Sequence, residues 1–143
     1  MWNEERLDAM LSEPSAALIG EMGAIQGDIM ILGAGGKVGP SLSLMAKRAV
    51  EAAGGTNRVI AVSRFSDPIV VSVLKEHGVE MIGADLSDPA QVAALPKVPN
   101  VIYMAGRKFG TSGAACQTWA MNVSVPTLVA HHFQAARYVV FST

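Results

Sequence analysis

Five short apolar runs, separated by stretches with helical periodicity, constrain the fold of this 143-residue chain more than any other feature. Because the runs are apolar along their length rather than alternating with polar residues, they are typical of parallel strands buried on both faces. The intervening stretches supply the crossovers that parallel strands need. The sequence therefore predicts a doubly wound parallel α/β sheet of the Rossmann-like kind, truncated after its fifth strand. The runs cover residues 28–33, 58–63, 79–85, 100–106 and 137–143.

The N-terminal residues precede this alternation and predict a separate segment. We expect residues 1–27 to form a helical extension and residues 28–143 to form one α/β domain, present in part. Ser12 stands where a helix N-cap belongs, and Pro14 lies near the first helical turn, where a missing N–H costs little. The extension is expected to pack on the outside of the domain, with a dimer contact as the alternative.

Composition excludes several classes of function. Half of the residues are hydrophobic, 16% are charged and the formal net charge is −1, which is typical neither of disordered chains nor of proteins that bind nucleic acid or acidic membranes. The single cysteine and the absence of a secretion signal predict a cytoplasmic protein. No apolar stretch reaches the length of a membrane span. The histidines lack the spacing of metal ligands, so no metal site is expected.

The glycine turn "GAGGKVG" lies directly between the first predicted strand and the first long predicted helix. Its glycines are spaced as G-x-x-G-x-x-G, at Gly33, Gly36 and Gly39. A P-loop is excluded because Val38, not Ser or Thr, follows Lys37. The G-x-G-x-x-G fingerprint is excluded as well, because its last glycine would fall on Val38.

A glycine turn in this position predicts a phosphate site. The free N–H groups at a helix N-terminus attract anions, and glycines let a pyrophosphate approach the backbone closely. We expect Lys37 and Val38, inside the turn, to lie against the phosphates. The alternative is a tight strand-to-helix turn with no ligand.

Four further motifs follow the glycine turn in a fixed order along the chain. They are "GADLSD" (83–88), "YMAG" (103–106), "NVSVPTLV" (122–129) and "VVFST" (139–143). Together with the turn, they resemble the N-terminal half of the extended short-chain dehydrogenase/reductase family, the NAD-dependent epimerase/dehydratase group. The resemblance covers about residues 28–143. It is specific for the family and says little about the substrate.

The resemblance implies a nicotinamide dinucleotide as cofactor and assigns residues to it. Asp85 would face the adenine ring and Leu86 would line its pocket. Capping of the next helix is the alternative for Asp85. The segment Met104, Ala105 and Gly106 would leave room beside the cofactor ribose, or would simply end a strand.

The predicted helix at 117–136 contains a proline. Pro126 removes one helical hydrogen bond and clashes with the carbonyl four residues earlier, which belongs to Asn122. We therefore expect an irregular backbone there. The resemblance implies that Asn122 supports a water-linked proton relay. An ordinary exposed helix residue is the alternative.

The end of the second predicted strand bears on the choice between NADP and NAD. Ser63 stands where dinucleotide folds place an acidic residue, and Arg64 follows it. Arginine pairs with a phosphate in a bidentate manner, which favours NADP. Asp67 is the alternative, since a carboxylate that accepts from the ribose 2′-OH would select NAD.

Catalysis in this family needs a tyrosine with a lysine four residues later. The fourth residue after Tyr103 is Arg107, and the fourth after Tyr138 is Ser142, so neither tyrosine forms the pair. Thr143 or Ser142, at the end of the fifth strand, is the catalytic candidate that the resemblance assigns. We expect the 143-residue chain by itself to be inactive.

The whole protein is expected to be an oxidoreductase, epimerase or dehydratase that acts on a sugar nucleotide or another small hydroxylated metabolite. The alternative is a non-catalytic module that senses NAD(P). The open edge of the fifth strand predicts a homo-oligomer.

Overall fold

A five-stranded, all-parallel sheet forms the centre of the protein, in the order β3-β2-β1-β4-β5. A computed structural model describes residues 4–107 and 114–141 of the chain. The order and the parallel pairing confirm the predicted doubly wound sheet. The strands are β1 (Ile29–Leu32), β2 (Val59–Ser63), β3 (Glu80–Gly83), β4 (Asn100–Tyr103) and β5 (Arg137–Val140).

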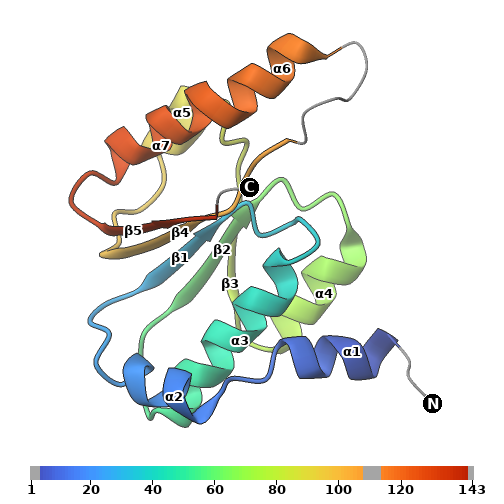
Figure 1. Cartoon of the computed structure of the whole chain (residues 1–143), viewed down its shortest axis with the longest axis vertical. Helices are drawn as coiled ribbons and strands as arrows, with labels where there is room; N and C mark the ends of the chain where they lie inside the picture. Colours follow the sequence, from blue (N-terminus) through green and yellow to red (C-terminus); the bar gives the residue numbers. More distant parts are fainter. Residues whose placement is uncertain (1–3, 108–113, 142–143) are drawn as a thin grey trace.

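Helices cover both faces of the sheet (Figure 1). One face carries α3 (Gly39–Ala52) and α4 (Pro68–Glu76), and the other carries α5 (Pro89–Ala93), α6 (Ala115–Trp119) and α7 (Val125–His132). A π-helical turn, Ala120–Ser124, joins α6 to α7. The N-terminal helices α1 (Glu4–Leu11) and α2 (Ala16–Met22) both contact α3.

Strand β1 shows why the apolar runs have no polar alternation. All four of its residues are buried, and successive side chains enter different core clusters. Met30 and Leu32 lie in the cluster under α5 and α7, while Ile29 and Ile31 lie in the cluster under α3 and α4. A strand buried on both faces must be apolar at every position.

Side-chain capping marks the starts of three helices, α2, α4 and α5. The carboxylates of Asp67 and Asp88 accept hydrogen bonds from the first turns of α4 and α5. The prediction that Ser12 is a helix N-cap is wrong. Ser15 caps α2, whereas Ser12 directly follows α1 and donates to the Asp8 carbonyl at 2.7 Å. Arg48 of α3 donates to the Ser12 hydroxyl at 2.7 Å, so a contact distant in sequence decides the role of Ser12.

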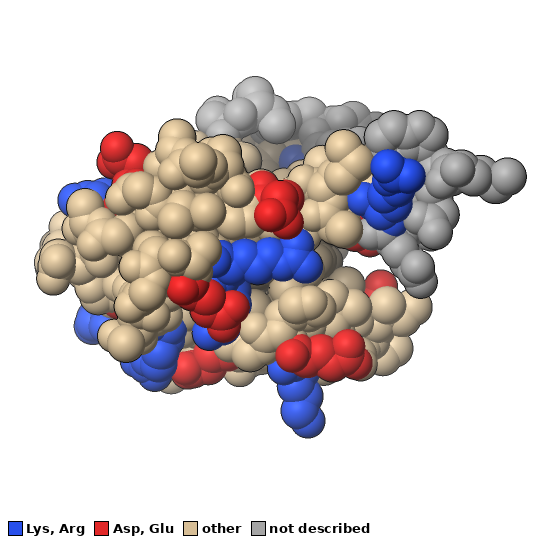
Figure 2. Space-filling model, turned by 90° about the horizontal axis from the view of Figure 1, so that it is seen from below, with Lys and Arg blue, Asp and Glu red and all other residues tan. Residues whose placement is uncertain are grey.

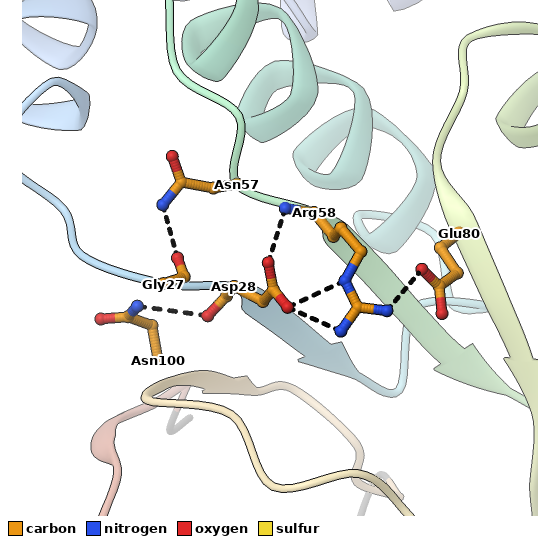
Figure 3. Close-up of polar contacts among 6 residues, drawn as sticks. All are labelled: Gly27, Asp28, Asn57, Arg58, Glu80 and Asn100. Atoms are coloured by element: carbon orange, nitrogen blue, oxygen red, sulfur yellow. Dashed lines mark hydrogen bonds and ion pairs between the residues drawn. The ribbon is translucent and has the colours of Figure 1, made fainter.

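An ion network joins the amino ends of three neighbouring strands, opposite to the end where β1 leads into the glycine turn (Figure 3). Arg58 contacts Asp28 at 2.7 Å and Glu80 at 3.3 Å. Burial by itself raises the pKa of Asp28, but the hydrogen bonds from the side chain and backbone of Arg58 outweigh it, so the pKa lies below its ordinary value.

In the view of Figure 2, basic and acidic side chains are interspersed over the surface, and neither sign gathers into a patch.

Asp28→Asn is expected to destabilise the protein at neutral pH. Because the pKa of Asp28 is lower in the folded than in the unfolded state, its stabilisation is present above the unfolded pKa of about 3.9 and is lost as the pH falls through the folded value. Thermal unfolding should give a lower Tm for Asp28→Asn than for the wild type at pH 7, and the difference should shrink below about pH 4. The control is Glu21→Gln, an exposed carboxylate on α2. A Tm difference that stays constant with pH would contradict the assignment.

Candidate functional site

A cavity of about 320 Å³ lies at the carboxyl end of the sheet. Its walls come mainly from the segments that follow β1, β2, β3 and β4, which all leave the sheet at this edge. The chain continues from β1 to β2 on one side and returns to β4 on the other, so β1 and β4 flank the topological switch point. Open α/β sheets bind ligands in the crevice at that point. The lining residues are Gly33, Gly35, Gly36, Ser63, Arg64, Phe65, Ser66, Asp67, Val70, Ala84, Asp85, Leu86, Ser87, Met104, Ala105, Gly106 and Met121.

The three glycines of the G-x-x-G-x-x-G spacing have different environments. Gly33 has φ +89°, and a Cβ there would lie 2.6 Å from the Ala105 nitrogen. A Cβ at Gly39 would overlap the backbone of Ala34. At Gly36 the nearest atom to a Cβ would be the Gly33 carbonyl oxygen at 3.7 Å, an ordinary contact. The protein's own packing thus requires glycine at 33 and 39 but not at 36, which lines the cavity.

Helix α3 begins beside this turn without a side-chain cap. Val38 occupies the N-cap position, where no side chain accepts from the first turn, and Pro40 lies within that turn. Lys37 and Val38 are exposed, and neither lines the cavity. No side-chain cap therefore competes with an anion for the N–H groups of the first turn of α3.

The segment after β2 forms a second wall. Ser63 and Arg64 both line the cavity, and Phe65 adopts φ +47°, a left-handed conformation that is uncommon for a bulky residue. One carboxylate oxygen of Asp67 accepts from the Ile69 N–H at 2.9 Å. Asp67 therefore caps α4 while it lines the same cavity.

Asp85 lies on the wall formed after β3. Its carboxylate accepts from the Ser87 hydroxyl at 2.6 Å and from the Ser87 N–H at 2.9 Å. These two hydrogen bonds, with a smaller attraction from Arg64, hold the pKa of Asp85 below its ordinary value. Asp88, not Asp85, caps α5. Asp85 is thus an ionised group at the cavity, next to the apolar side chain of Leu86.

Asn122 lies near the cavity but does not line it. Its side-chain oxygen accepts from the Arg107 N–H at 2.9 Å, and its amide nitrogen donates to the Arg107 carbonyl at 2.7 Å. The Arg107 guanidinium donates to Gln117 of α6. The two Asn122 bonds connect the π-helical turn to the segment that follows β4, and the backbone at Asn122 is irregular, as expected from Pro126.

The cavity contains residues that sequence reasoning missed. Phe65, Ser66, Ala84 and Ser87 adjoin residues that were predicted, so extending each predicted segment would have found them. Gly35 was part of the recognised turn. Val70 and Met121 project from helices, and no local signal in the sequence indicates their place in the wall.

The two tyrosines of β4 and β5 pack together beneath the helices. Their rings stack with centroids 6.3 Å apart, and neither hydroxyl has a hydrogen-bond partner among the described residues. Burial raises the pKa of Tyr103 to about 12, and burial with the neighbouring Tyr103 raises that of Tyr138. These shifts are opposite to what a general acid/base at neutral pH needs. The catalytic candidates Ser142 and Thr143 lie outside the described residues.

The part of the chain that the structure describes carries neither a metal-binding cluster nor a membrane-spanning helix. Within it, no three His, Cys, Asp or Glu side chains gather in a way that would hold a metal ion. None of the helices in the same part is both long and apolar enough to cross a membrane.

Comparison with known proteins finds the fold in other chains. No protein-family model and no curated protein matches the sequence. The Bordetella bronchiseptica enzyme WbmF, solved with NAD+ and UDP, is 20% identical, with a TM-score of 0.64 over 83% of this chain and 36% of WbmF. The Helicobacter pylori ADP-L-glycero-D-manno-heptose-6-epimerase is 16% identical, with a TM-score of 0.67 over 85% of this chain and 40% of the epimerase.

A third solved structure has a different named activity. Ribose-5-phosphate isomerase from Brucella melitensis 16M is 19% identical, with a TM-score of 0.60 over 83% of this chain and 52% of the isomerase. The chain spans 36% and 40% of the lengths of WbmF and the heptose epimerase. At these identities the comparisons show a shared Rossmann-like fold.

Proposed function

We propose that this chain is the cofactor-binding part of an NAD(P)-dependent oxidoreductase, epimerase or dehydratase of the extended short-chain dehydrogenase/reductase family. The observation that carries the proposal is the cavity at the switch point of the sheet, walled by residues of three of the five family-like motifs and by the segment after β2. The Rossmann-like neighbours support it, including one solved with NAD+ and UDP. By the same resemblance, the substrate of the whole protein is a sugar nucleotide or another small hydroxylated metabolite.

The residues present fit a dinucleotide. The space above Gly36, which a Cβ would enter, and the uncapped start of α3 suit a pyrophosphate. Ser63 and Arg64 would meet the adenosine ribose, Leu86 would lie against the adenine, and Ala105 and Gly106 would leave room for the second ribose. The nicotinamide supplies hydride transfer when it is bound. Isothermal titration calorimetry with NADPH and NADH tests this, and no saturable binding of either would refute it.

Within this proposal we favour NADP, and Arg64 provides the test. A charge-assisted pair between Arg64 and the 2′-phosphate would add about 1.5–3 kcal/mol, so Arg64→Ala should weaken NADPH binding by about 10–100-fold and change NADH binding little. Lys75→Ala, which removes a positive charge from α4 outside the cavity, is the matched control. Equal affinity of the wild type for both cofactors would count against the role of Arg64, and preference for NADH would favour the alternative in which Asp67 selects NAD.

A module that senses NAD(P) without turnover is the second candidate. It is favoured by the two described tyrosines, because burial raises the pKa of both away from what a general acid/base at neutral pH needs. Product formation from candidate sugar nucleotides by the whole protein, measured together with NADPH absorbance because epimerisation and dehydration regenerate the cofactor, separates an enzyme from a sensor. Assembly into a homo-oligomer also belongs to the proposal. It is supported by the edge strand β5, where Val139 and Val140 are about half exposed, and we expect the protein in the cytoplasm.

A further inference from the structure

Pro126 accounts for the π-helical turn between α6 and α7. Proline has no N–H, so the α-helical bond to the Asn122 carbonyl cannot form. Just before it, the Val125 N–H donates to the Ala120 carbonyl, five residues back, which is the π-helical pattern. Just after it, the Thr127 hydroxyl donates to the Val123 carbonyl at 2.8 Å. The helix thus continues past the proline by taking in one wider turn.

The wider turn changes which way Asn122 faces. In a regular α-helix, positions i, i+3 and i+7 share one face, so Asn122 would align with Val125 and Val129. These two valines are 3% and 0% exposed and belong to the core over the sheet. A regular helix would therefore turn the Asn122 amide toward an apolar layer, where an amide without a hydrogen-bond partner is unfavourable.

The structure instead brings the Asn122 amide to the Arg107 backbone. Both of its hydrogen-bonding groups are used there, at 2.9 and 2.7 Å. The contact adjoins the cavity, since a Cβ on Gly106 would lie 3.4 Å from the Asn122 side-chain oxygen. Met121, the preceding residue, itself lines the cavity.

We propose that Pro126 is a positioning residue for this cavity. It acts through the π-helical turn, which keeps Asn122 on the Arg107 backbone and Met121 in the cavity wall. The effect of Pro126 on the positions of Asn122 and Met121 concerns the ligand-free protein. The effect on NADPH binding rests on the proposed function.

The first test is hydrogen exchange of the Arg107 amide, measured by NMR on the ligand-free protein. This N–H donates to Asn122, so it should be protected in the wild type. Both Asn122→Ala and Pro126→Ala should speed its exchange by at least about tenfold. Pro89→Ala, which replaces a proline in the first turn of α5, should leave it protected. Wild-type protection of the Arg107 amide in Pro126→Ala would overturn the proposal.

The second test uses a pair of substitutions and does not require Pro126→Ala to fold. Leucine at 122 suits the apolar face of a regular helix, so Asn122→Leu combined with Pro126→Ala should unfold at a higher urea concentration than additive single effects predict. Strict additivity, or a double variant that fails to fold while Asn122→Leu folds, would overturn the proposal.

Cofactor binding gives the functional measurement. Pro126→Ala should weaken NADPH binding several-fold without contacting the ligand, and unchanged affinity would limit Pro126 to a structural role and refute its effect on the cavity. If the wild type binds no dinucleotide, the proposed function fails, while the exchange and stability tests still decide the role of Pro126.

Discussion

Gly33→Ala is expected to remove a large part of the free energy of unfolding, about 2–6 kcal/mol of a typical 5–15 kcal/mol. Gly33 has φ +89°, where a side chain is strained, and the added Cβ would lie 2.6 Å from the Ala105 nitrogen. Ala105 cannot easily retreat, because the neighbouring Met104 N–H donates to the Leu32 carbonyl at 2.9 Å. Urea unfolding followed by circular dichroism measures the loss.

The control for Gly33→Ala is the same substitution at Gly20. Gly20 lies within α2, and a Cβ there would meet no atom within 4 Å. Gly20→Ala should keep or slightly raise stability, because alanine favours a helix by up to about 1 kcal/mol over glycine. A Gly33→Ala variant as stable as the wild type would show that the turn is not packed against the segment after β4 in the way described.

Gly36→Ala, three residues further on, is expected to have the opposite profile. Its Cβ would make only an ordinary contact of 3.7 Å, so the urea midpoint should hardly change. The same Cβ would occupy the space proposed for the pyrophosphate, so affinity for NADPH should fall at least about tenfold, or about 1.4 kcal/mol, with a further loss for Gly36→Val. Calorimetry measures the affinity, and Gly20→Val is the control for binding.

The two outcomes together separate a phosphate site from a bare strand-to-helix turn. If the turn only reverses the chain, Gly36 has no role in ligand binding, and the Gly36→Ala variant should bind NADPH as the wild type does. If the turn holds a pyrophosphate, Gly33→Ala should lower the stability, whereas Gly36→Ala should lower the affinity for NADPH and leave the stability nearly unchanged. Unchanged NADPH affinity in Gly36→Ala would therefore count against the cofactor site itself.

Much of the fold could be predicted because its signals are local. Asp67 and Asp88 each precede a proline and an apolar helical pattern, and both are N-caps in the structure. The role of Ser12 could not be predicted in this way. Two serines lie near the break between α1 and α2, and Arg48 of α3, 36 residues away, holds Ser12 at the end of α1.

The residues of the candidate site could likewise be predicted from the sequence only in part. Parallel strands end at one edge of a sheet, so the residues after them were expected to meet, and Ser63, Arg64, Asp85 and Ala105 do line one cavity. Their roles toward a cofactor stay predictions. Met121 comes from the π-helical turn, and its place in the wall depends on how that helix packs on the sheet.

The sequence by itself determined the alternation of strands and helices and the position of the glycine turn between β1 and α3. Periodicity and glycine spacing express local backbone preferences, so they can be read without a structure. Only the tertiary structure decided that Gly33 and Gly39 are required by packing while Gly36 is free, and that Asn122 faces Arg107 rather than the valines on its helix. The physical reason is that a Cβ clash or an amide's partner depends on atoms from a distant segment, which only the folded chain brings within a few ångströms.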